Sequence, residues 1–419
     1  MALAAWMADV VEFVRDRPRL AAAAAIAFLA IVAPIWWLGP QRGAAAPSRA
    51  DQTAASSRVP DKVLVPPPPP TARLEQCASG SIPVIVGSSQ LASDMEAAQS
   101  AADSALARLP TELAARSTDR DHALGLYLQM VAAPSAASYE ACGGDYAACQ
   151  QALSTAIAET QGALVRIATH TSDSDAYALA VYSCMWLFAG TRNADCDLLS
   201  YAQWAGIEPD NAVPWLYLAG DAQRHGDQST VGAALYRASK ARFSNPHLDQ
   251  ISGLVYSNAA AALSPTFQTE LAGTLLSIQG GLPHPNLSVV MRYCGDAGQT
   301  VAGHVQTCGD LAAMLVVRSR TAIEVLIGGR VAEQVSWANP RLAPLRDEAD
   351  AMRWQLFRMP GSQQAQMLPG CDSTQRLLAI AAAQAQFGES GRLRQELAAR
   401  GVTTAQAAEA WRAARRWPR

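Results

Sequence analysis

The sequence has little charge and almost no lysine. Charged residues make up 16% of the 419 residues, the formal net charge is −3, and the two lysines are Lys62 and Lys240. A nucleic-acid-binding surface usually needs a clear basic excess, so the composition argues against a nucleic-acid partner. Half of the residues are nevertheless apolar. That share is typical of closely packed helices rather than of a disordered chain.

The sequence also lacks the short motifs that reveal many enzymes and metal sites. It contains no HExxH, GxSxG, GxGxxG or phosphate-loop motif and no CxxC pair. His284 and His304 lie near Cys294 and Cys308, but their spacing is not that of zinc ligands. We therefore expect no catalytic residue, cofactor or metal ion. Paired carboxylates that act across a cleft leave no sequence signature, so an envelope enzyme acting on peptidoglycan stays an alternative.

Residues 20–38 form an uncharged apolar run near the N-terminus. At about 1.5 Å per residue its length approaches the ~30 Å hydrocarbon thickness of a bilayer. Trp36 and Trp37 close the run, where aromatic rings prefer the membrane interface. A cleaved signal peptide, cut near residues 44–46, is the alternative, but its apolar region is usually shorter. The run therefore predicts an uncleaved transmembrane helix.

The apolar run divides the chain into further segments. Residues 1–19 form a short stub that we expect in the cytoplasm. Residues 39–76 are rich in Ala, Ser and Pro, and the prolines at 66–70 favour a stiff polyproline II conformation. We interpret 39–76 as a linker and residues 77–419 as the folded domain.

All eight cysteines follow the apolar run. An even number on one side of a membrane is typical of disulfides in an oxidising compartment. We therefore expect an inner-membrane protein whose C-terminal domain lies in the periplasm. Eight cysteines allow 105 pairings, but three pairs flank short, polar, Gly-containing turns. The predicted disulfides are Cys184–Cys196, Cys294–Cys308, Cys142–Cys149 and, by remainder, Cys77–Cys371.

Beyond residue 77 the apolar residues follow a helical period almost throughout. Most segments between polar, Gly-containing breaks have the length of ordinary globular helices. Short connections place successive helices antiparallel. The sequence therefore predicts an all-α domain of stacked antiparallel helical hairpins.

Residues 178–245 carry an internal repeat pattern. The segment from Ile207 to Trp215 has the sequence IEPDNAVPW, and it resembles the junction between two tetratricopeptide repeats. The resemblance implies an α-solenoid with a groove for partner proteins or peptides. It also implies that Trp215 is buried between two hairpins. An α-helical bundle with one tetratricopeptide-like hairpin is the alternative.

Aromatic and basic residues cluster around this repeat. Trp204, Tyr217, Arg224 and His225 are candidates for partner binding, because aromatic residues and arginine are enriched at interface hot spots. At helical spacing the aromatic residues also suit a core. The sequence as a whole predicts a membrane-anchored periplasmic helical-repeat protein that binds another envelope protein as a scaffold or assembly factor. A structural subunit of an envelope machine is a further alternative.

We expect residues 20–38 to remain attached in the mature protein. Their length and terminal tryptophans suit a spanning helix better than a signal peptide. N-terminal sequencing of the native protein tests this expectation. A mature chain that starts near Pro47 would contradict it.

Overall fold

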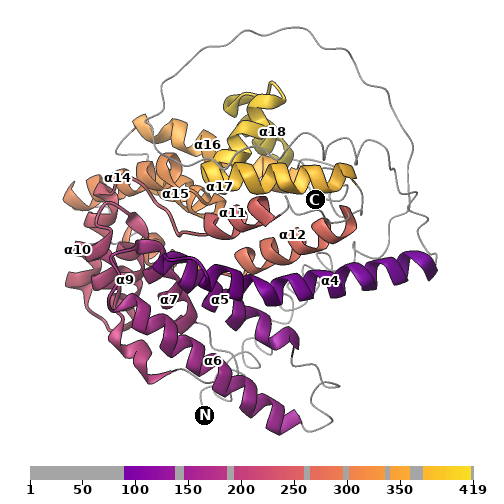
Figure 1. Cartoon of the computed structure of the whole chain (residues 1–419). Helices are drawn as coiled ribbons and strands as arrows, with labels where there is room; N and C mark the ends of the chain where they lie inside the picture. Colours follow the sequence, from indigo (N-terminus) through magenta and orange to yellow (C-terminus); the bar gives the residue numbers. More distant parts are fainter. Residues whose placement is uncertain are drawn as a thin grey trace, which may run out of the picture. The chain divides into compact units, whose positions relative to one another are not determined.

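The structure is a computed structural model, and one unit of it, Val63–Arg419, contains every residue that it describes. The described residues are 89–136, 146–185, 193–258, 265–295, 302–335, 340–358 and 371–416. They form fifteen α-helices and two 3-10 helices, and no β-strand occurs among them. Figure 1 shows the arrangement of these helices. The prediction of an all-α domain is confirmed for this part of the chain.

The first helices are α4 (Ser89–Ala114), α5 (Asp119–Ala136), α6 (Tyr146–Ala168), α7 (Ser174–Met185), α8 (Tyr201–Ile207), α9 (Ala212–Arg224), α10 (Gln228–Lys240) and α11 (Asp249–Asn258). They are followed by α12 (Pro265–Gly280), α13 (Ser288–Tyr293), α14 (Ala302–Arg318), α15 (Ala322–Val335), α16 (Ala343–Arg358), α17 (Cys371–Ala399) and α18 (Thr404–Arg416). The 3-10 helices are η3 (Ala194–Leu198) and η4 (Pro340–Leu342).

The predicted membrane helix and linker, residues 20–38 and 39–76, lie outside the described residues. The stub at 1–19 lies outside them as well. Within the described ranges, no helix combines the length and the apolar character needed to cross a membrane.

Two large clusters of buried side chains form the core. The first joins α4 to α8 with α11 and α12, and its largest fully buried members include Tyr127, Tyr182 and Trp204. The second joins α9 and α10 with α13, α14 and α15, around Leu216 and Leu235. Consecutive helices mostly pack together, but α12 also packs on α4, and α17 packs on α11 and α12. Such contacts between distant helices are not those of a simple stack, in which each hairpin touches only its neighbours.

The hairpin of α9 and α10 forms as the sequence predicts. Asn211 caps α9 by accepting a hydrogen bond from the Val213 amide at 3.1 Å. Gly226 turns the chain at a positive φ of 75°, and Asp227 then caps α10. Asn211 Nδ2 donates to the carbonyl of Asn245, 34 residues later, at 2.7 Å. The unit that contains this hairpin therefore has the length of a tetratricopeptide repeat.

The prediction for Trp215 is wrong in one respect, because the side chain is only partly buried. Its indole Nε1 donates to the Pro209 carbonyl at 3.0 Å, near the surface. Leu216 is fully buried in its place, together with Ala212 and Ala219. The buried stripe of α9 is thus shifted by one residue, because α8, α10 and α13 all cover this helix. Trp215 lies at the edge of the second core cluster.

Two predicted disulfides are confirmed, Cys184–Cys196 and Cys294–Cys308, each with a Cα–Cα distance of 5.7 Å. Cys149 is disulfide-bonded as well, while its predicted partner Cys142 lies outside the described residues. The predicted Cys77–Cys371 link falls outside the description too, since it involves residue 77 and a side chain that is not described. Closing loops of 12 and 14 residues stabilises a fold by ~3 kcal/mol in the chain-entropy model.

We expect Trp204→Ala to destabilise the domain far more than Trp215→Ala. Trp204 is fully buried, and its ring lies 5.8 Å from that of Tyr182 and 5.7 Å from that of Tyr217. Its loss should lower the free energy of unfolding by about 3–5 kcal/mol, against about 1 kcal/mol for Trp215. Urea unfolding of the disulfide-intact protein, followed by circular dichroism, measures both. Equal losses would contradict the burial of the two residues described above.

Candidate functional site

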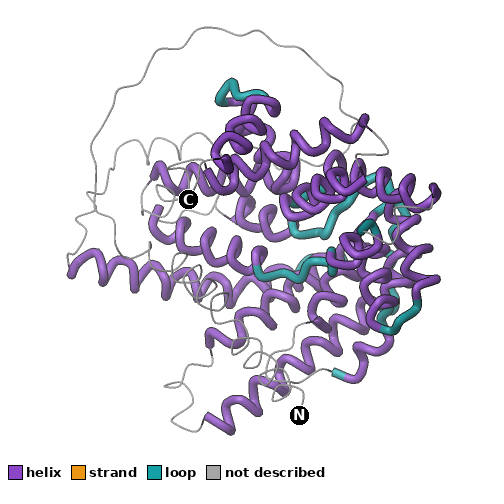
Figure 2. Tube along the Cα trace, turned by 180° about the vertical axis from the view of Figure 1, so that it is seen from behind, coloured by secondary structure: helices purple, strands orange, loops and turns teal. Residues whose placement is uncertain are grey.

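Four connecting segments lie side by side and bring several helix starts together. The amide of Ala212 donates to the Phe243 carbonyl at 2.9 Å. The amide of Arg320 donates to the Ser244 carbonyl at 3.0 Å, and the amide of Ser390 donates to the Arg320 carbonyl at 3.1 Å. The four segments precede α9, α11, α15 and the part of α17 that follows Gly388, respectively. Figure 2 shows loops of the described residues, in teal, running between the helices.

Gly388 divides α17 into two limbs. Its φ of 71° is outside the helical range. A Cβ at this position would lie 2.6 Å from the Cβ of Arg320 and 2.7 Å from its carbonyl oxygen. Only glycine combines the positive φ with this close approach. The bend of α17 at Gly388 and the segment 318–321 therefore fix each other's position.

A cavity of about 580 Å³ lies among α11, α12, α15, α16 and α17. Its walls combine polar and charged side chains with large aliphatic ones, and these aliphatic side chains are Leu248, Leu276, Ile323, Leu326, Leu356, Leu377, Ile380 and Leu393. Ile323 is 41% exposed and Phe357 is 66% exposed, although both are large apolar residues. Since both also line the cavity, its mouth presents an apolar surface to solvent.

The charged residues of the cavity are engaged with one another or with helix ends. Arg320 forms an ion pair with Asp249 at 3.0 Å and donates to the Ala385 carbonyl at 3.0 Å, at the end of the first limb of α17. Burial raises the pKa of Asp249, although the Arg320 guanidinium and His247 act in the opposite direction. Glu389 accepts a hydrogen bond from the first amide of α15, at Ala322.

Four side chains of the cavity wall carry a buried polar atom without a hydrogen-bond partner. These atoms are Nε of Arg320, Nε of Arg392, Oε1 of Gln355 and Oε1 of Gln384. Gln355 is only 6% exposed, and its Nε2 donates to the Leu393 carbonyl at 2.7 Å. A buried polar atom without a partner costs about 1–3 kcal/mol. Four of the nine such side-chain atoms among the described residues belong to this cavity wall.

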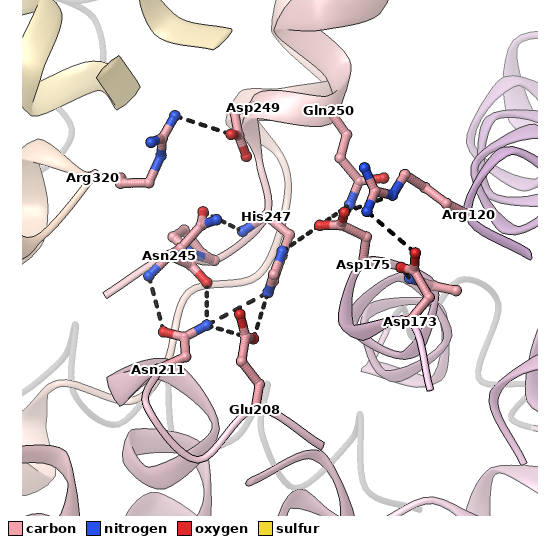
Figure 3. A network of polar contacts seen from close by, with 12 residues as sticks. Arg120, Asp173, Asp175, Glu208, Asn211, Asn245, His247, Asp249, Gln250 and Arg320 are labelled. Carbon is pink, nitrogen blue, oxygen red and sulfur yellow. Dashed lines mark hydrogen bonds and ion pairs between the residues drawn. The ribbon is translucent and has the colours of Figure 1, made fainter. Parts of the chain in front are cut away.

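A network of polar contacts adjoins the cavity at Asn245 and Asp249 and centres on His247 (Figure 3). His247 is 4% exposed and adopts a positive φ of 59°. Its Nε2 donates to Glu208 at 2.8 Å, and its Nδ1 donates to Asp175. Arg120 pairs with the same Asp175 at 2.7 Å. Because both ring nitrogens donate to carboxylates, the ring is the doubly protonated imidazolium.

The pKa values agree with this assignment. Burial opposes the charge of His247, but the hydrogen bonds to Asp175 and Glu208 outweigh it and raise the pKa of His247 to about 10. For Asp175, burial is likewise outweighed by His247 and Arg120, and its pKa is lowered. A histidine that stays protonated near neutral pH is not a general base. The network therefore joins α5, α7, the end of α8 and the segment before α11 by ion pairs.

The network positions one wall of the cavity. Asn245 and Asp249 lie two residues before and two residues after His247, and both line the cavity. His247 itself does not line it. The Asn245 side-chain oxygen accepts a hydrogen bond from the His247 backbone amide at 2.9 Å, and the Asn245 backbone amide donates to the Asn211 side-chain oxygen at 3.0 Å. The polar network therefore holds the segment 245–249 on one side, and the other side of the segment lines the cavity.

The structure does not bring the predicted partner-binding residues to this site. Trp204 and Tyr217 are 0% and 4% exposed and lie in the first core cluster, so their prediction as surface residues is wrong. Helical spacing favours burial of such large rings. Arg224 and His225 are exposed at the end of α9, where each contacts Asp221, and neither lines the cavity.

The cavity residues carry no local sequence signal. Asp249 and Arg320 are 71 residues apart, and the Gln355 contact to Glu396 spans 41. Within the described ranges, no group of three or more His, Cys, Asp or Glu is placed to hold a metal ion. The disulfide between Cys294 and Cys308 also removes both thiolates from the metal site considered with His284 and His304.

Comparison of the chain with protein-family models, curated proteins and solved structures found no match. The tetratricopeptide-like resemblance therefore rests on the residue pattern and on the α9–α10 hairpin.

We expect the buried His247 ion pairs to stabilise the fold below about pH 6.5 and to lose this effect at alkaline pH. The pKa of His247 is raised from 6.5 to about 10 on folding. Its contribution is therefore complete below the unfolded pKa and disappears as the pH rises through about 10. Asparagine tolerates a positive φ, so His247→Asn is the matched variant. Urea unfolding of both proteins from about pH 6 to about pH 10.5 should show a shrinking difference in unfolding free energy. A difference that is constant across this range would disprove the expectation.

Proposed function

We propose that this chain is a single-pass inner-membrane protein whose helical domain lies in the periplasm and binds a segment of another envelope protein. The membrane placement rests on the apolar run at 20–38. The periplasmic location rests on the cysteines after that run and draws support from the two disulfides among the described residues.

The cavity is the observation that supports a binding role. Its volume of about 580 Å³ is within the range of ~300–1,000 Å³ that is typical of ligand sites. The aliphatic wall and the exposed Ile323 and Phe357 suit an apolar side chain. The unpartnered atoms of Gln355 and Arg320 suit the N–H and C=O groups of a peptide backbone. A polypeptide segment supplies both kinds of group, after a small rotation of the wall side chains.

The stacked-hairpin architecture is part of the same proposal. The 34-residue unit around α9 and α10 supports it. However, nearly all of the cavity wall comes from residues after 245. The partner site that we propose is therefore different from the groove that the tetratricopeptide-like segment implies.

A tethered envelope enzyme acting on peptidoglycan is the second candidate, and one observation favours it. Asp249 lies in the cavity and its pKa is raised, which is a property of general acids. The ion pair of Asp249 with Arg320 and the aliphatic side chains of the wall fit a binding site better. Incubation of the full chain with purified peptidoglycan tests the enzyme directly, because a hydrolase releases soluble fragments.

We expect a photo-crosslinking amino acid placed at Phe357 to capture one envelope protein in native membranes. Gly280→Trp should abolish this product, because Gly280 lines the cavity and has open space around its Cβ position. Gly303→Trp is the matched control, since Gly303 also has open space but does not line the cavity. A crosslinker at the exposed Tyr236 of α10 controls for surface contacts.

The crosslinking result separates a cavity partner from a chance neighbour. A product that appears with Phe357 and survives Gly280→Trp would overturn the cavity as the binding site. A product that appears equally from Tyr236 would show unspecific capture. Loss with Gly280→Trp and retention with Gly303→Trp is the outcome that supports the proposal.

A further inference from the structure

The unpartnered polar atoms of the cavity wall fall into two pairs, one on each side of the bend at Gly388. Gln384 lies on the limb of α17 before the bend, and its Oε1 has no hydrogen-bond partner among the described residues. Nε of Arg320 has none either. The Arg320 guanidinium donates to the Gln384 backbone carbonyl at 3.5 Å, so the two residues are neighbours. This first pair offers one acceptor and one donor.

The second pair lies at the limb of α17 that follows the bend. It consists of Oε1 of Gln355 and Nε of Arg392, which likewise lack partners among the described residues. Both side chains reach one carboxylate, because Arg392 pairs with Glu396 and Nε2 of Gln355 donates to Glu396 at 3.2 Å. Gln355 is 6% exposed. This pair again offers one acceptor and one donor.

The charges of the wall make both pairs suitable for neutral groups. Arg320 already forms an ion pair with Asp249, and Arg392 with Glu396. The remaining Nε of each guanidinium therefore suits a neutral acceptor better than a second anion. A main-chain peptide unit supplies a neutral C=O for each donor and a neutral N–H for each glutamine oxygen.

We propose that the partner segment binds the cavity in an extended conformation, with two alternate residues held by their main-chain groups, one at each pair. Inside an α-helix the N–H and C=O groups bond to one another, so a helical segment has few left for the wall. In an extended segment, the main-chain groups of alternate residues point to the same edge, roughly 7 Å apart. The inference rests on the proposed function and adds the conformation of the partner and the groups that are recognised.

The test uses the detergent-solubilised full chain, immobilised and exposed to a random pool of short synthetic peptides. Mass spectrometry identifies the retained peptides. In one of them, each main-chain amide is then replaced in turn by an ester, which removes one N–H donor. We expect binding to weaken by about three- to tenfold at two positions that lie two residues apart. An ester at the position between them should have little effect, because its N–H points to the opposite edge.

Two glutamine variants assign these positions to the wall. Gln384→Met removes one of the two acceptors and keeps the length of the side chain. In this variant, the ester effect should vanish at one of the two positions and persist at the other. Gln334→Met is the matched control, since Oε1 of Gln334 also lacks a partner among the described residues but Gln334 does not line the cavity. Both positions should stay sensitive in this control.

The outcomes separate this inference from the proposed function. Retained peptides that respond to esters three or four positions apart, or to none, would overturn the inference and leave the proposed function standing. An ester pattern that is unchanged by Gln384→Met would do the same. No retention beyond that of Gly280→Trp would overturn both. Retention of phosphatidylglycerol from mixed micelles but of no peptide would also overturn both, because a lipid has no main chain.

Discussion

The imidazolium of His247, held between Asp175 and Glu208, is the interaction on which the rest of the described structure depends. A buried charge is tolerated only where partners of opposite charge are in place. Those partners come from α7 and from the end of α8, while His247 lies in the segment before α11. The three elements therefore have one mutual arrangement in which the charge is satisfied. Arg120 extends the same pairing to α5, at a half-exposed position where water reaches the network.

The shape of the cavity follows from this arrangement. Fixing His247 fixes Asp249 two residues later, and Asp249 binds Arg320 at the start of α15. Arg320 in turn binds the last carbonyls of the first limb of α17, and its backbone lies against Gly388. The cavity walls are thus tied to a buried ion-pair network. A preformed cavity loses less entropy when a ligand binds than one that must first be assembled.

The buried polar side chains of the described residues differ in whether all of their polar atoms have hydrogen-bond partners. Glu324 is buried, and its carboxylate accepts hydrogen bonds from the hydroxyls of Ser244, Ser319 and Thr321. This network joins two of the connecting segments and leaves that carboxylate well satisfied. In the cavity wall, by contrast, Gln355 and Gln384 each keep an oxygen without a partner. Complete satisfaction suits a structural junction, whereas incomplete satisfaction suits a surface that a ligand completes.

The sequence by itself determined the features that depend on nearby residues. Helical periodicity and glycine-containing breaks predicted an all-α domain. Short spacing across polar turns predicted the Cys184–Cys196 and Cys294–Cys308 disulfides. Tertiary structure alone decided that Leu216 rather than Trp215 is fully buried, because neighbouring helices cover both sides of α9.

The tertiary structure also decided the partners of His247 and the composition of the cavity. His247 lies 72 residues from Asp175 and 39 from Glu208, and Arg320 lies 71 from Asp249. Hydrogen bonds within a helix join residues a few positions apart, so they leave a periodic pattern in the sequence. Contacts between distant segments leave no such pattern, because they depend on how whole helices pack.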